Sequence, residues 1–454
     1  MRLSSLILAV VLASSSSHIL AAPPLPSGIF NAPTLPEGID KPNSPTKMDS
    51  LFSQPQTFNI NGFMDLRSGF RTQKDAHEGQ QPLNETRLQL ELQKEIGPVS
   101  INLTSDFIYD AEASQHAIDL DKGKGWIDLR EASIAFSPFP FIDIKAGRQV
   151  LTWGTGDLIF INDLFPKDWQ AFFIGRDLDY LKAPSDAIKT SFFTDIGNID
   201  IVYTPRFDAD RGITGEKLSY YNPLSNSQSG ENSIIKPKKP HSDEWSMRIY
   251  KNFGSSELSL YGYHGFWKSP LGFDPGSNKN RYPLLRSVGA SLRKPLWRGI
   301  THVELGYYDS YERGAAKNPF TPNSETRFLI GYEQELIKNF TISVQYYLEW
   351  MQDYGKYESS LEAIGAAVKR DKIRHVLTNR LSLLTHQQNV TWSLFTFYSP
   401  SDADAYLRPN VSYKVNDQWT IEAGGNFFVG EENNTFFAQF KNNNNIYGSI
   451  QYGF

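Results

Sequence analysis

The chain has 454 residues, a formal net charge of -5 and no cysteine, and its mean hydropathy is -0.42. A negative mean hydropathy excludes a protein that crosses a membrane with several helices, because each crossing needs about 20 apolar residues. The absence of cysteine excludes a disulfide scaffold and cysteine-ligated metal sites. Without a basic excess, no nucleic-acid partner is expected. A soluble aromatic-rich protein remains, or a membrane protein whose apolar residues alternate with polar ones.

The first 22 residues predict a secretory signal peptide. Arg2 precedes the apolar run 6–13, and Ala21 and Ala22 end the segment. A charged start, a short apolar core and small residues before the cleavage point are the features of an export signal, and a buried N-terminal helix is the alternative. The chain is therefore expected to be exported.

Residues 23–55 contain eight prolines and few bulky apolar side chains. Such a segment buries too little surface to offset the entropy lost on ordering. We expect an extended periplasmic leader between the signal peptide (1–22) and a barrel domain (56–454). A tether or plug that enters the pore is the alternative to a plain linker.

From residue 56 onward, apolar and polar residues alternate. Between residues 340 and 351, for example, every second residue is Phe, Ile, Val, Tyr, Leu or Trp, and the residues between them are mainly polar. A period of two predicts a strand with one apolar and one polar face. The same pattern predicts eighteen strands, at 56–72, 84–96, 99–110, 125–137, 142–153, 187–194, 199–207, 241–253, 256–267, 283–294, 299–310, 325–336, 340–351, 372–385, 389–399, 402–414, 418–429 and 445–454.

Short connections alternate with long ones along this pattern. The turn at 97–98 is short, whereas the connections 154–186 and 208–240 are long. The connection near 399–402 is short where a long one is due. Strands of uniform length, with short turns at one end and long loops at the other, are typical of a bacterial outer-membrane barrel. We therefore predict an all-β fold: a closed antiparallel transmembrane β-barrel of about 18 strands, with both termini on the periplasmic side.

The last predicted strand, 445–454, carries Ile450, Tyr452 and Phe454 on one face. An amphipathic final strand that ends in an aromatic residue resembles the signal by which outer-membrane barrels reach the barrel-assembly machinery. This machinery is thus an expected partner through Phe454, together with outer-membrane lipid and lipopolysaccharide.

Three of the predicted strands, 125–137, 142–153 and 256–267, change parity or are ambiguous, and β-bulges are expected there. Arg148 falls on the lipid-facing parity of its strand. A guanidinium facing hydrocarbon costs about 2–4 kcal/mol at mid-depth. Either a bulge turns Arg148 into the lumen, or Arg148 lies above the apolar band.

The polar faces of the strands are expected to line an aqueous lumen. On this register, equal numbers of acids and bases point inward, so the lining favours neither cations nor anions. The loop 154–186 carries charged residues among Trp169, Phe172 and Phe173. Folding into the lumen would bury these rings, and we expect the loop to form a constriction, with a compact external cap as the alternative. The predicted pore-lining or constriction residues are Arg67, Arg87, Glu91, Asp128, Arg130, Lys145, Arg148, Asp157, Asp163, Lys167, Asp168, Arg176, Arg327, Arg380 and Arg408.

The stretch from 126 to 207 carries the most distinctive motifs. They are Gly147-Arg148-Gln149 with Trp153-Gly154, then Asp157, Pro166-Lys167-Asp168, Pro184 with Ala187 and Lys189, and Tyr203-Thr204-Pro205-Arg206-Phe207. These motifs resemble an uncharacterised family of Gram-negative outer-membrane barrels, a domain of unknown function with a GRQ…WG motif followed by D…P-x-D. They are more distantly similar to the alginate-export porins. Phe165 stands where the family usually has Asn, and Thr155 where it usually has an acid. The resemblance implies a porin or export channel and no particular substrate.

The sequence lacks the motifs of common enzymes: G-x-S-x-G, H-E-x-x-H and the P-loop. A Ser paired with His264 near the lipid boundary is the enzymatic alternative. We expect no enzyme, no cofactor and no metal site. The sequence predicts an outer-membrane porin or export channel for small hydrophilic or anionic solutes. The alternative is a non-conducting barrel that serves as an assembly or interaction platform for an envelope complex, with a periplasmic partner bound by residues 23–55.

Overall fold

The computed structural model divides the chain into two units, Met1–Gln56 and Thr57–Phe454. It describes residues 59–113, 116–213, 215–222, 226–231, 237–312, 314–364 and 369–454. The predicted signal peptide (1–22) and leader (23–55) lie outside the described residues.

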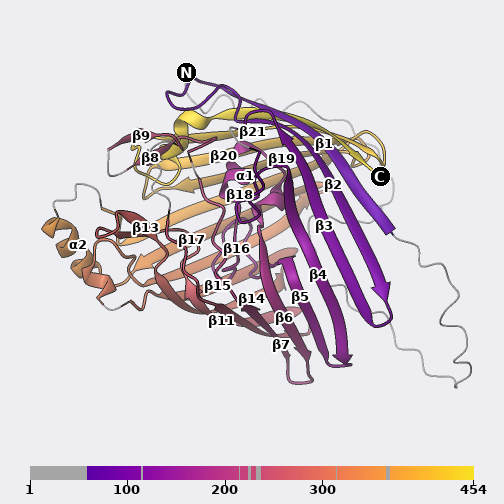
Figure 1. Ribbon diagram of the computed structural model, residues 1–454, viewed down its shortest axis with the longest axis horizontal. Coiled ribbons are helices and arrows are strands. Elements are labelled where there is room, and N and C mark those ends of the chain that lie inside the picture. Colours follow the sequence, from indigo (N-terminus) through magenta and orange to yellow (C-terminus); the bar gives the residue numbers. More distant parts are fainter. Residues whose placement is uncertain are drawn as a thin grey trace, which may run out of the picture. The chain divides into compact units, whose positions relative to one another are not determined.

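Eighteen strands of the second unit form one antiparallel sheet. Each strand pairs with the next barrel strand along the chain, and β1 also pairs with β22, so the sheet closes into a barrel (Figure 1). A closed barrel leaves no free strand edge, which a sheet that faces lipid requires. The barrel strands are β1 (Asn59–Arg71), β2 (Leu83–Ile96), β3 (Val99–Asp110), β4 (Ile127–Phe139), β5 (Ile142–Val150), β6 (Pro184–Phe193), β7 (Asn198–Thr204), β10 (Glu244–Phe253), β11 (Ser256–Phe266), β14 (Leu284–Leu296), β15 (Gly299–Asp309), β16 (Glu325–Ile337), β17 (Phe340–Met351), β18 (Ile373–Thr385), β19 (Val390–Ser399), β20 (Asp404–Lys414), β21 (Trp419–Gly430) and β22 (Asn445–Gly453).

Smaller elements occupy the long connections. They are the hairpins β8 (Tyr220–Asn222) with β9 (Ser227–Ser229) and β12 (Gly272–Asp274) with β13 (Lys279–Arg281), the helices α1 (Trp169–Ile174) and α2 (Tyr354–Ala363), and the 3-10 turns η2 (Leu178–Leu181), η4 (Ala315–Lys317) and η5 (Ala438–Asn443). In Figure 1, α2, β8, β9 and β13 gather at the left-hand end, away from the short turns of β2–β3 and β6–β7. Helix α1 is seen among the barrel strands instead.

The predicted fold class and all eighteen predicted strands are confirmed, with ends that differ by a few residues. The bulge expected in 125–137 is present, because Arg130 is an extra residue between Leu129 and Glu131, which pair with consecutive residues of β3. The prediction of a bulge in 256–267 is wrong, because β11 pairs regularly with both neighbouring strands. In the third segment, 142–153, β5 pairs regularly with β6. Its pairing with β4 is irregular at one place only, between Ile142 and Ile144.

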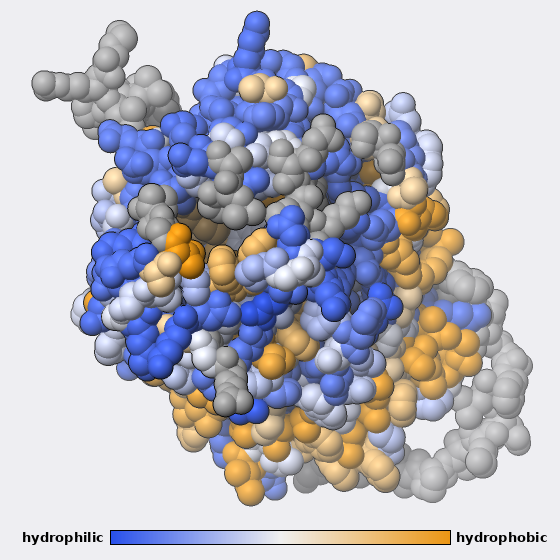
Figure 2. All heavy atoms as spheres, turned by 60° about the vertical axis from the view of Figure 1, so that its left-hand side comes forward, coloured by the Kyte–Doolittle hydropathy of each residue, from blue (hydrophilic) through white to orange (hydrophobic). Residues whose placement is uncertain are grey.

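The two faces of the barrel wall differ in polarity. On the outside of β17, Val344 and Trp350 are 45% and 43% exposed, whereas Gln345 on the inside is buried. Figure 2 shows hydrophilic residues over the loop end and apolar residues on the adjoining outer wall. An apolar outer band around a polar interior is the architecture of an outer-membrane β-barrel. In the part of the chain that the structure describes, no helix is long and apolar enough to cross a membrane.

The largest group of buried apolar side chains lies inside the barrel. It joins wall residues such as Tyr308 and Tyr406 with loop residues such as Ile161, Phe172 and Phe437. Because apolar surface in contact with water is unfavourable, wall rings and loop rings stabilise each other by removing that surface from water. The loops that carry these rings are therefore packed against the inner face of the barrel wall.

Candidate functional site

The loop that joins β5 to β6, residues 151–183, crosses the barrel interior. It leaves the wall at β5 and reaches β15 and β17, on nearly the opposite side, before α1 returns along β20 and β1. We call residues 154–162 the first limb and residues 168–182 the second limb. The two limbs contact different parts of the wall.

One carboxylate on β15 holds the first limb. Thr155 donates to Glu304 from its N–H and from its hydroxyl (2.9 Å), and Gly156 donates from its N–H (2.9 Å). Asn162 donates from its N–H (3.3 Å) and from its side-chain amide (2.9 Å). Glu304 is 0% exposed, so loop donors rather than water stabilise its charge.

Asp157 extends this contact to β17 and β18. Its carboxylate forms a two-point ion pair with Arg380, with Nε–Oδ2 at 2.6 Å and Nη2–Oδ1 at 2.7 Å. Its N–H donates to Oε1 of Gln345 (2.8 Å), and Nε2 of Gln345 donates to its carbonyl (2.9 Å). The amide of Gln345 thus pairs with the backbone of Asp157 as a neighbouring strand would. The first limb is fixed through both its side chains and its backbone.

A buried lysine closes the bend between the two limbs. Nζ of Lys167 donates to Asp163 (2.9 Å) and to the carbonyl of Phe165 (2.8 Å). Asp163 also accepts a hydrogen bond from the hydroxyl of Thr152 (2.7 Å). Lys167 and Asp163 are both buried, so this ion pair shapes the loop and does not offer a free charge to a solute.

The second limb begins with helix α1. The side chain of Asp168 accepts a hydrogen bond from a backbone N–H of the first turn (2.7 Å), and Gly175 ends the helix in the left-handed conformation (φ 97°). The rings of Phe172 and Phe173 lie 5.6 and 5.4 Å from the ring of Tyr406 on β20, measured between centroids. Because a helix this short is not stable by itself, these ring contacts with the wall hold it in place.

Three wall arginines bind carbonyl oxygens of the second limb. Arg67 on β1 donates to the carbonyl of the residue that ends α1 (2.9 Å), and Arg408 on β20 donates to the next carbonyl, that of Arg176 (2.8 Å). Arg130 on β4 donates to the carbonyl of Lys182 (2.9 Å). Hydrogen bonds from charged donors are roughly twice as strong as neutral ones, so the wall arginines act as clamps on the loop backbone.

Tyr180 of the second limb lies between two of the wall arginines. The guanidinium carbons of Arg87 and Arg130 are 4.2 and 4.8 Å from the centroid of its ring. Arg87 is also paired with Glu85 (2.6 Å) and with Asp106. The ring of Tyr180 therefore packs between one arginine that is paired with two acids and one that binds loop carbonyls, and burial raises the pKa of its hydroxyl well above the ordinary value.

Five cations from four loops bind five acids of the wall. The pairs are Arg176–Glu85 (2.5 Å), Arg211–Asp128 (2.8 Å), Lys217–Asp110, Lys268–Glu244 (2.7 Å) and Arg370–Glu325 (3.1 Å). A buried acid without a partner is strongly unfavourable. Glu85 and Glu325 are also paired with wall arginines, whereas the only ion pairs of Asp128, Asp110 and Glu244 among the described residues are with loop cations. These three acids therefore specify where a loop docks.

The structure brings most of the predicted lining residues together around the loop. Those that make or support its contacts are Arg67, Arg87, Asp128, Arg130, Arg380 and Arg408 on the wall, and Asp157, Asp163, Lys167, Asp168 and Arg176 on the loop. Arg327 lies apart from them on β16, 2.9 Å from Glu325. Lys145 is paired with Glu131 at 2.6 Å, and Glu91 is exposed near the short-turn end of β2.

Arg148 does not line the lumen, which corrects its predicted place among the pore-lining residues. It lies on the outward parity of β5 and donates to the carbonyls of Leu129 (2.6 Å) and Leu120 (2.7 Å). Its guanidinium also pairs with Asp186 at 3.2 Å. No bulge turns it inward: it lies at the loop end of the strand, where the connection that contains Leu120 covers it.

The register also corrects the predicted charge balance of the wall. The inward positions hold more acids than bases, and several of these acids lie near strand ends. The additional inward acids are Glu85, Glu95, Asp110, Glu131, Asp200, Glu244, Glu257, Glu325, Glu335 and Asp404, and the additional bases are Arg71, Lys189, Arg293 and Lys414. Loop cations compensate part of this excess, and the wall alone does not attract anions.

Two residues that hold the loop, Glu304 and Gln345, were not among the predicted site residues. Both lie on inward parities of their strands. Their partners on the first limb are 142 to 188 residues away in the sequence. A local period of two marks such a residue as inward and polar, but it contains no signal for which distant loop the residue binds.

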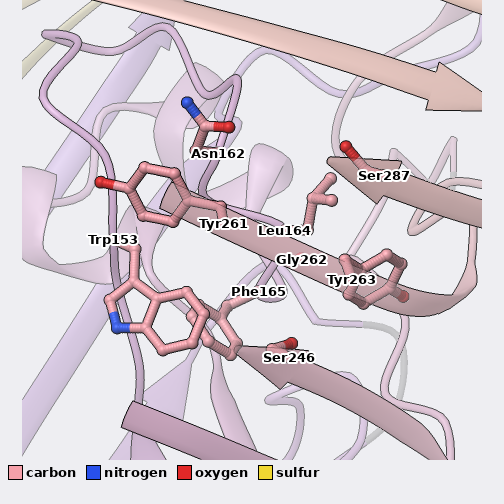
Figure 3. A pocket seen from close by; sticks show the side chains of 9 residues that line it. All are labelled: Trp153, Asn162, Leu164, Phe165, Ser246, Tyr261, Gly262, Tyr263 and Ser287. Carbon is pink, nitrogen blue, oxygen red and sulfur yellow. The ribbon is translucent and has the colours of Figure 1, made fainter. Parts of the chain in front are cut away.

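A small pocket lies beside the end of the first limb (Figure 3). Its lining includes Trp153 and Phe165, whose rings meet edge to face at 4.9 Å, and Tyr261 on β11. The volume of about 10 Å³ is the space of about one water molecule. It is therefore a gap in the packing rather than a site for a solute. Among the described residues, no group of His, Asp and Glu is arranged to hold a metal ion.

No protein-family model and no curated protein matches the chain. Among solved structures, OccAB1 of Acinetobacter baumannii is similar with a TM-score of 0.50 and 10% identity, over 87% of this chain and 96% of that chain. OccK11 (OpdR) and OccD3 (OpdP) of Pseudomonas aeruginosa are similar with TM-scores of 0.51 and 0.50 and identities of 6% and 8%, over 87% of this chain and 95% and 91% of those chains. Identities this low establish a shared fold alone. The resemblance to the GRQ…WG family and to the alginate-export porins stays a prediction.

The fold and its polarity place the chain in the outer membrane. A closed sheet satisfies all of its backbone hydrogen bonds internally, and its exposed apolar band is stable in lipid. Trp392 on β19 and Trp350 on β17 lie near opposite ends of their strands on the outer face, as aromatic residues do where a barrel meets the lipid headgroups.

Proposed function

We propose that the protein is an outer-membrane channel for small hydrophilic solutes, and that the loop between β5 and β6 (residues 151–183) narrows its lumen. The observation that carries the proposal is the position of this loop, which is bound inside an eighteen-stranded barrel at both of its limbs. A barrel of this size encloses an aqueous lumen unless loops fill it. A loop that is bound to the wall inside the barrel is well placed to set the width of that lumen.

The wall below the loop supports a hydrophilic path. Glu91 and Asp143 are exposed there, and Lys145 and Glu131 are partly exposed. Charged side chains that stay in contact with water keep a channel wet. Because acids outnumber bases on the inner wall, its charge does not favour the anionic solutes that the sequence suggested, and the proposal is for small hydrophilic solutes in general.

A non-conducting barrel that serves as an assembly or interaction platform is the second candidate. It is favoured by the apolar cluster inside the barrel, where Phe172 and Phe173 of one loop meet Phe440 and Leu218 of two others. Rings that extend across the whole lumen would close it to ions. The leader 23–55 would then be the segment to test for a periplasmic partner.

Ion conductance across a planar lipid bilayer separates the two candidates. The refolded mature protein is compared with a variant in which a short Gly-Ser linker replaces residues 155–182. We expect steps of conductance from the wild type and larger steps from the variant, because the variant lacks the loop inside the lumen. A variant shortened within α2 is the control, since that helix projects from the loop end of the barrel (Figure 1).

The channel proposal would be contradicted by barrels that are folded, as judged by their heat-dependent mobility in gels, but that do not conduct with or without the loop. That result would favour the platform. Arg408→Ala, which frees only the second limb, serves as a milder variant in case the linker variant does not fold.

A further inference from the structure

We infer that Glu304 is the positioning residue of the constriction: its carboxylate acts as an internal ligand that binds the first limb (154–162) to the wall. The inference rests on the proposed function, in which the loop narrows the lumen. It adds that one wall residue, Glu304, fixes the position of that loop. The inference implies that the first limb is fixed to the wall and does not move freely in the lumen, so that its position sets the width of the lumen.

The first limb has the form of an anion-binding loop. Five donors converge on the carboxylate of Glu304: three from Thr155 and Gly156 reach Oε1, and two from Asn162 reach Oε2. Backbone N–H groups that point to one place form a concavity that binds phosphates and carboxylates. Here the anion is a side chain of the barrel wall; Glu304 and Asn162 are buried, and Thr155 and Gly156 are partly buried.

The wall is also shaped to receive this segment. A Cβ at Gly289 on β14 would occupy the place of Oδ1 of Asn162, and a Cβ at Gly306 on β15 would come within 2.7 Å of the side chain of Ile161. Ile161 is 0% exposed, and its carbonyl accepts a hydrogen bond from the hydroxyl of Tyr308. The two glycines therefore leave recesses into which the first limb fits.

Glu304 accepts five of the hydrogen bonds that hold this segment. The ion pair between Asp157 and Arg380 is partly exposed, at 30% and 20% of the two side chains. Without the Glu304 carboxylate, five donors would lose their charged acceptor, and the two on the buried Asn162 would be left without water to replace it. The first limb is then expected to leave the wall. The donors remain on the limb, so a small free carboxylate of the same chemistry can take the vacant place.

The first test is conductance of Glu304→Ala with and without sodium acetate. We expect larger and noisier conductance steps than in the wild type, and a return toward the wild-type steps when acetate replaces chloride at equal ionic strength. Glu335→Ala is the matched control, because it removes a carboxylate from the inner face of the neighbouring strand β16, and the hydrogen bond that it accepts comes from the N–H of Asn339 at the short turn. Its conductance should not respond to acetate.

The second test follows the limb without any conduction. The chain has no cysteine, so Ile161→Cys provides a single thiol at a position that is 0% exposed. We expect maleimide to label it slowly beside Glu304, roughly tenfold faster or more in the Glu304→Ala background, and slowly again in acetate. Phe172→Cys, at a position 1% exposed on the second limb, should stay protected in both backgrounds.

The outcomes separate the inference from the proposed function. If the wild type does not conduct but labelling changes as expected, the channel proposal fails and the role of Glu304 stands. If the wild type conducts, but the loss of Glu304 changes neither labelling nor conductance, or acetate reverses neither, the role of Glu304 is overturned. Glu304→Gln keeps the side-chain volume and is measured alongside, so a folding failure of the alanine variant leaves the comparison intact. Unchanged labelling in the glutamine variant also overturns the inference.

Discussion

Arg211 and Asp128 form a two-point ion pair inside the barrel, with Nη1–Oδ2 and Nη2–Oδ1 both at 2.8 Å. Arg211 belongs to the loop after β7 and Asp128 to β4, and both are buried. Asp128 holds the pKa of Arg211 above its ordinary value against the opposing effect of burial, which is the larger single influence. The pair shows how a wall acid with no water to solvate it selects a cation from a distant loop.

Arg211→Ala is expected to lower the free energy of unfolding by about 3 kcal/mol or more, because removing one partner leaves the other charge buried and unpaired. The double variant with Asp128→Asn should recover part of this loss. Urea unfolding in detergent micelles, followed by tryptophan fluorescence, measures the change.

The control for this prediction is an exposed ion pair. Lys122 and Asp119 lie 2.8 Å apart, with side chains 55% and 37% exposed. Lys122→Ala should change the free energy of unfolding by less than about 1 kcal/mol. Equal losses for Arg211→Ala and Lys122→Ala would contradict the idea that buried pairs dock the loops.

Asp208, in the loop after β7, is expected to make stability depend on pH. Burial raises the pKa of its carboxyl to about 6, against the lowering effects of Lys268 and of a hydrogen bond from the N–H of Asp186. Because this pKa lies above the ordinary value of 3.8, the folded protein binds a proton between about pH 6 and 4 that the unfolded chain does not bind. The contribution of Asp208 to stability therefore increases as the pH falls through that window.

Asp208→Asn isolates this contribution, because its amide stays neutral. The variant should be more stable than the wild type at about pH 7.5, and the difference should shrink toward pH 4. Comparing the two proteins by urea unfolding across that range cancels the other groups that titrate. A difference that grows as the pH falls would show that the Asp208 carboxylate is stabilised in the folded protein.

The strands were predictable because their signal is local. A period of two depends on neighbouring residues, and the same period placed Gln345 and Glu349 on the inner face, where the structure has them. Helix α1 was not predictable, because its six residues carry no helical period of useful length and are held by rings on β20, more than 200 residues away. The outward parity of Arg148 was predicted, but the carbonyls that bind it come from a loop whose path the sequence does not encode locally.

Arg408→Ala is expected to free the second limb. Its guanidinium donates to the carbonyl of Arg176 (2.8 Å) and lies 4.9 Å from the ring centroid of Phe172. Its loss removes both a charge-assisted hydrogen bond and a cation–π contact. Trypsin should then cut the folded protein after Arg176 or Lys182, which the docked limb protects, and mass spectrometry of the fragments identifies the sites.

Arg408→Lys should give intermediate protection, because an ammonium keeps the charge but not the planar group that reaches the carbonyl and covers the ring. Arg286→Ala is the control, since Arg286 lies on the outer face, 4.0 Å from the ring centroid of Tyr311. Cleavage in the second limb at wild-type rates in Arg408→Ala would exclude the clamp.

Phe454 allows assembly in the cell to be separated from stability of the barrel. Its N–H donates to the carbonyl of Gly62 (3.0 Å) and its carbonyl accepts from the N–H of Gly62 (3.1 Å), so its backbone helps to close the seam between the first and last strands. Phe454→Ala keeps both hydrogen bonds and removes only the ring, whereas deletion of the residue removes the ring and the two hydrogen bonds.

If the assembly machinery recognises the ring, Phe454→Ala should reduce the amount of protein in outer-membrane fractions while refolding into detergent micelles stays unchanged. Deletion should reduce both, because it also opens the end of the seam. Wild-type amounts of Phe454→Ala in the membrane would show that the ring is not the recognised feature.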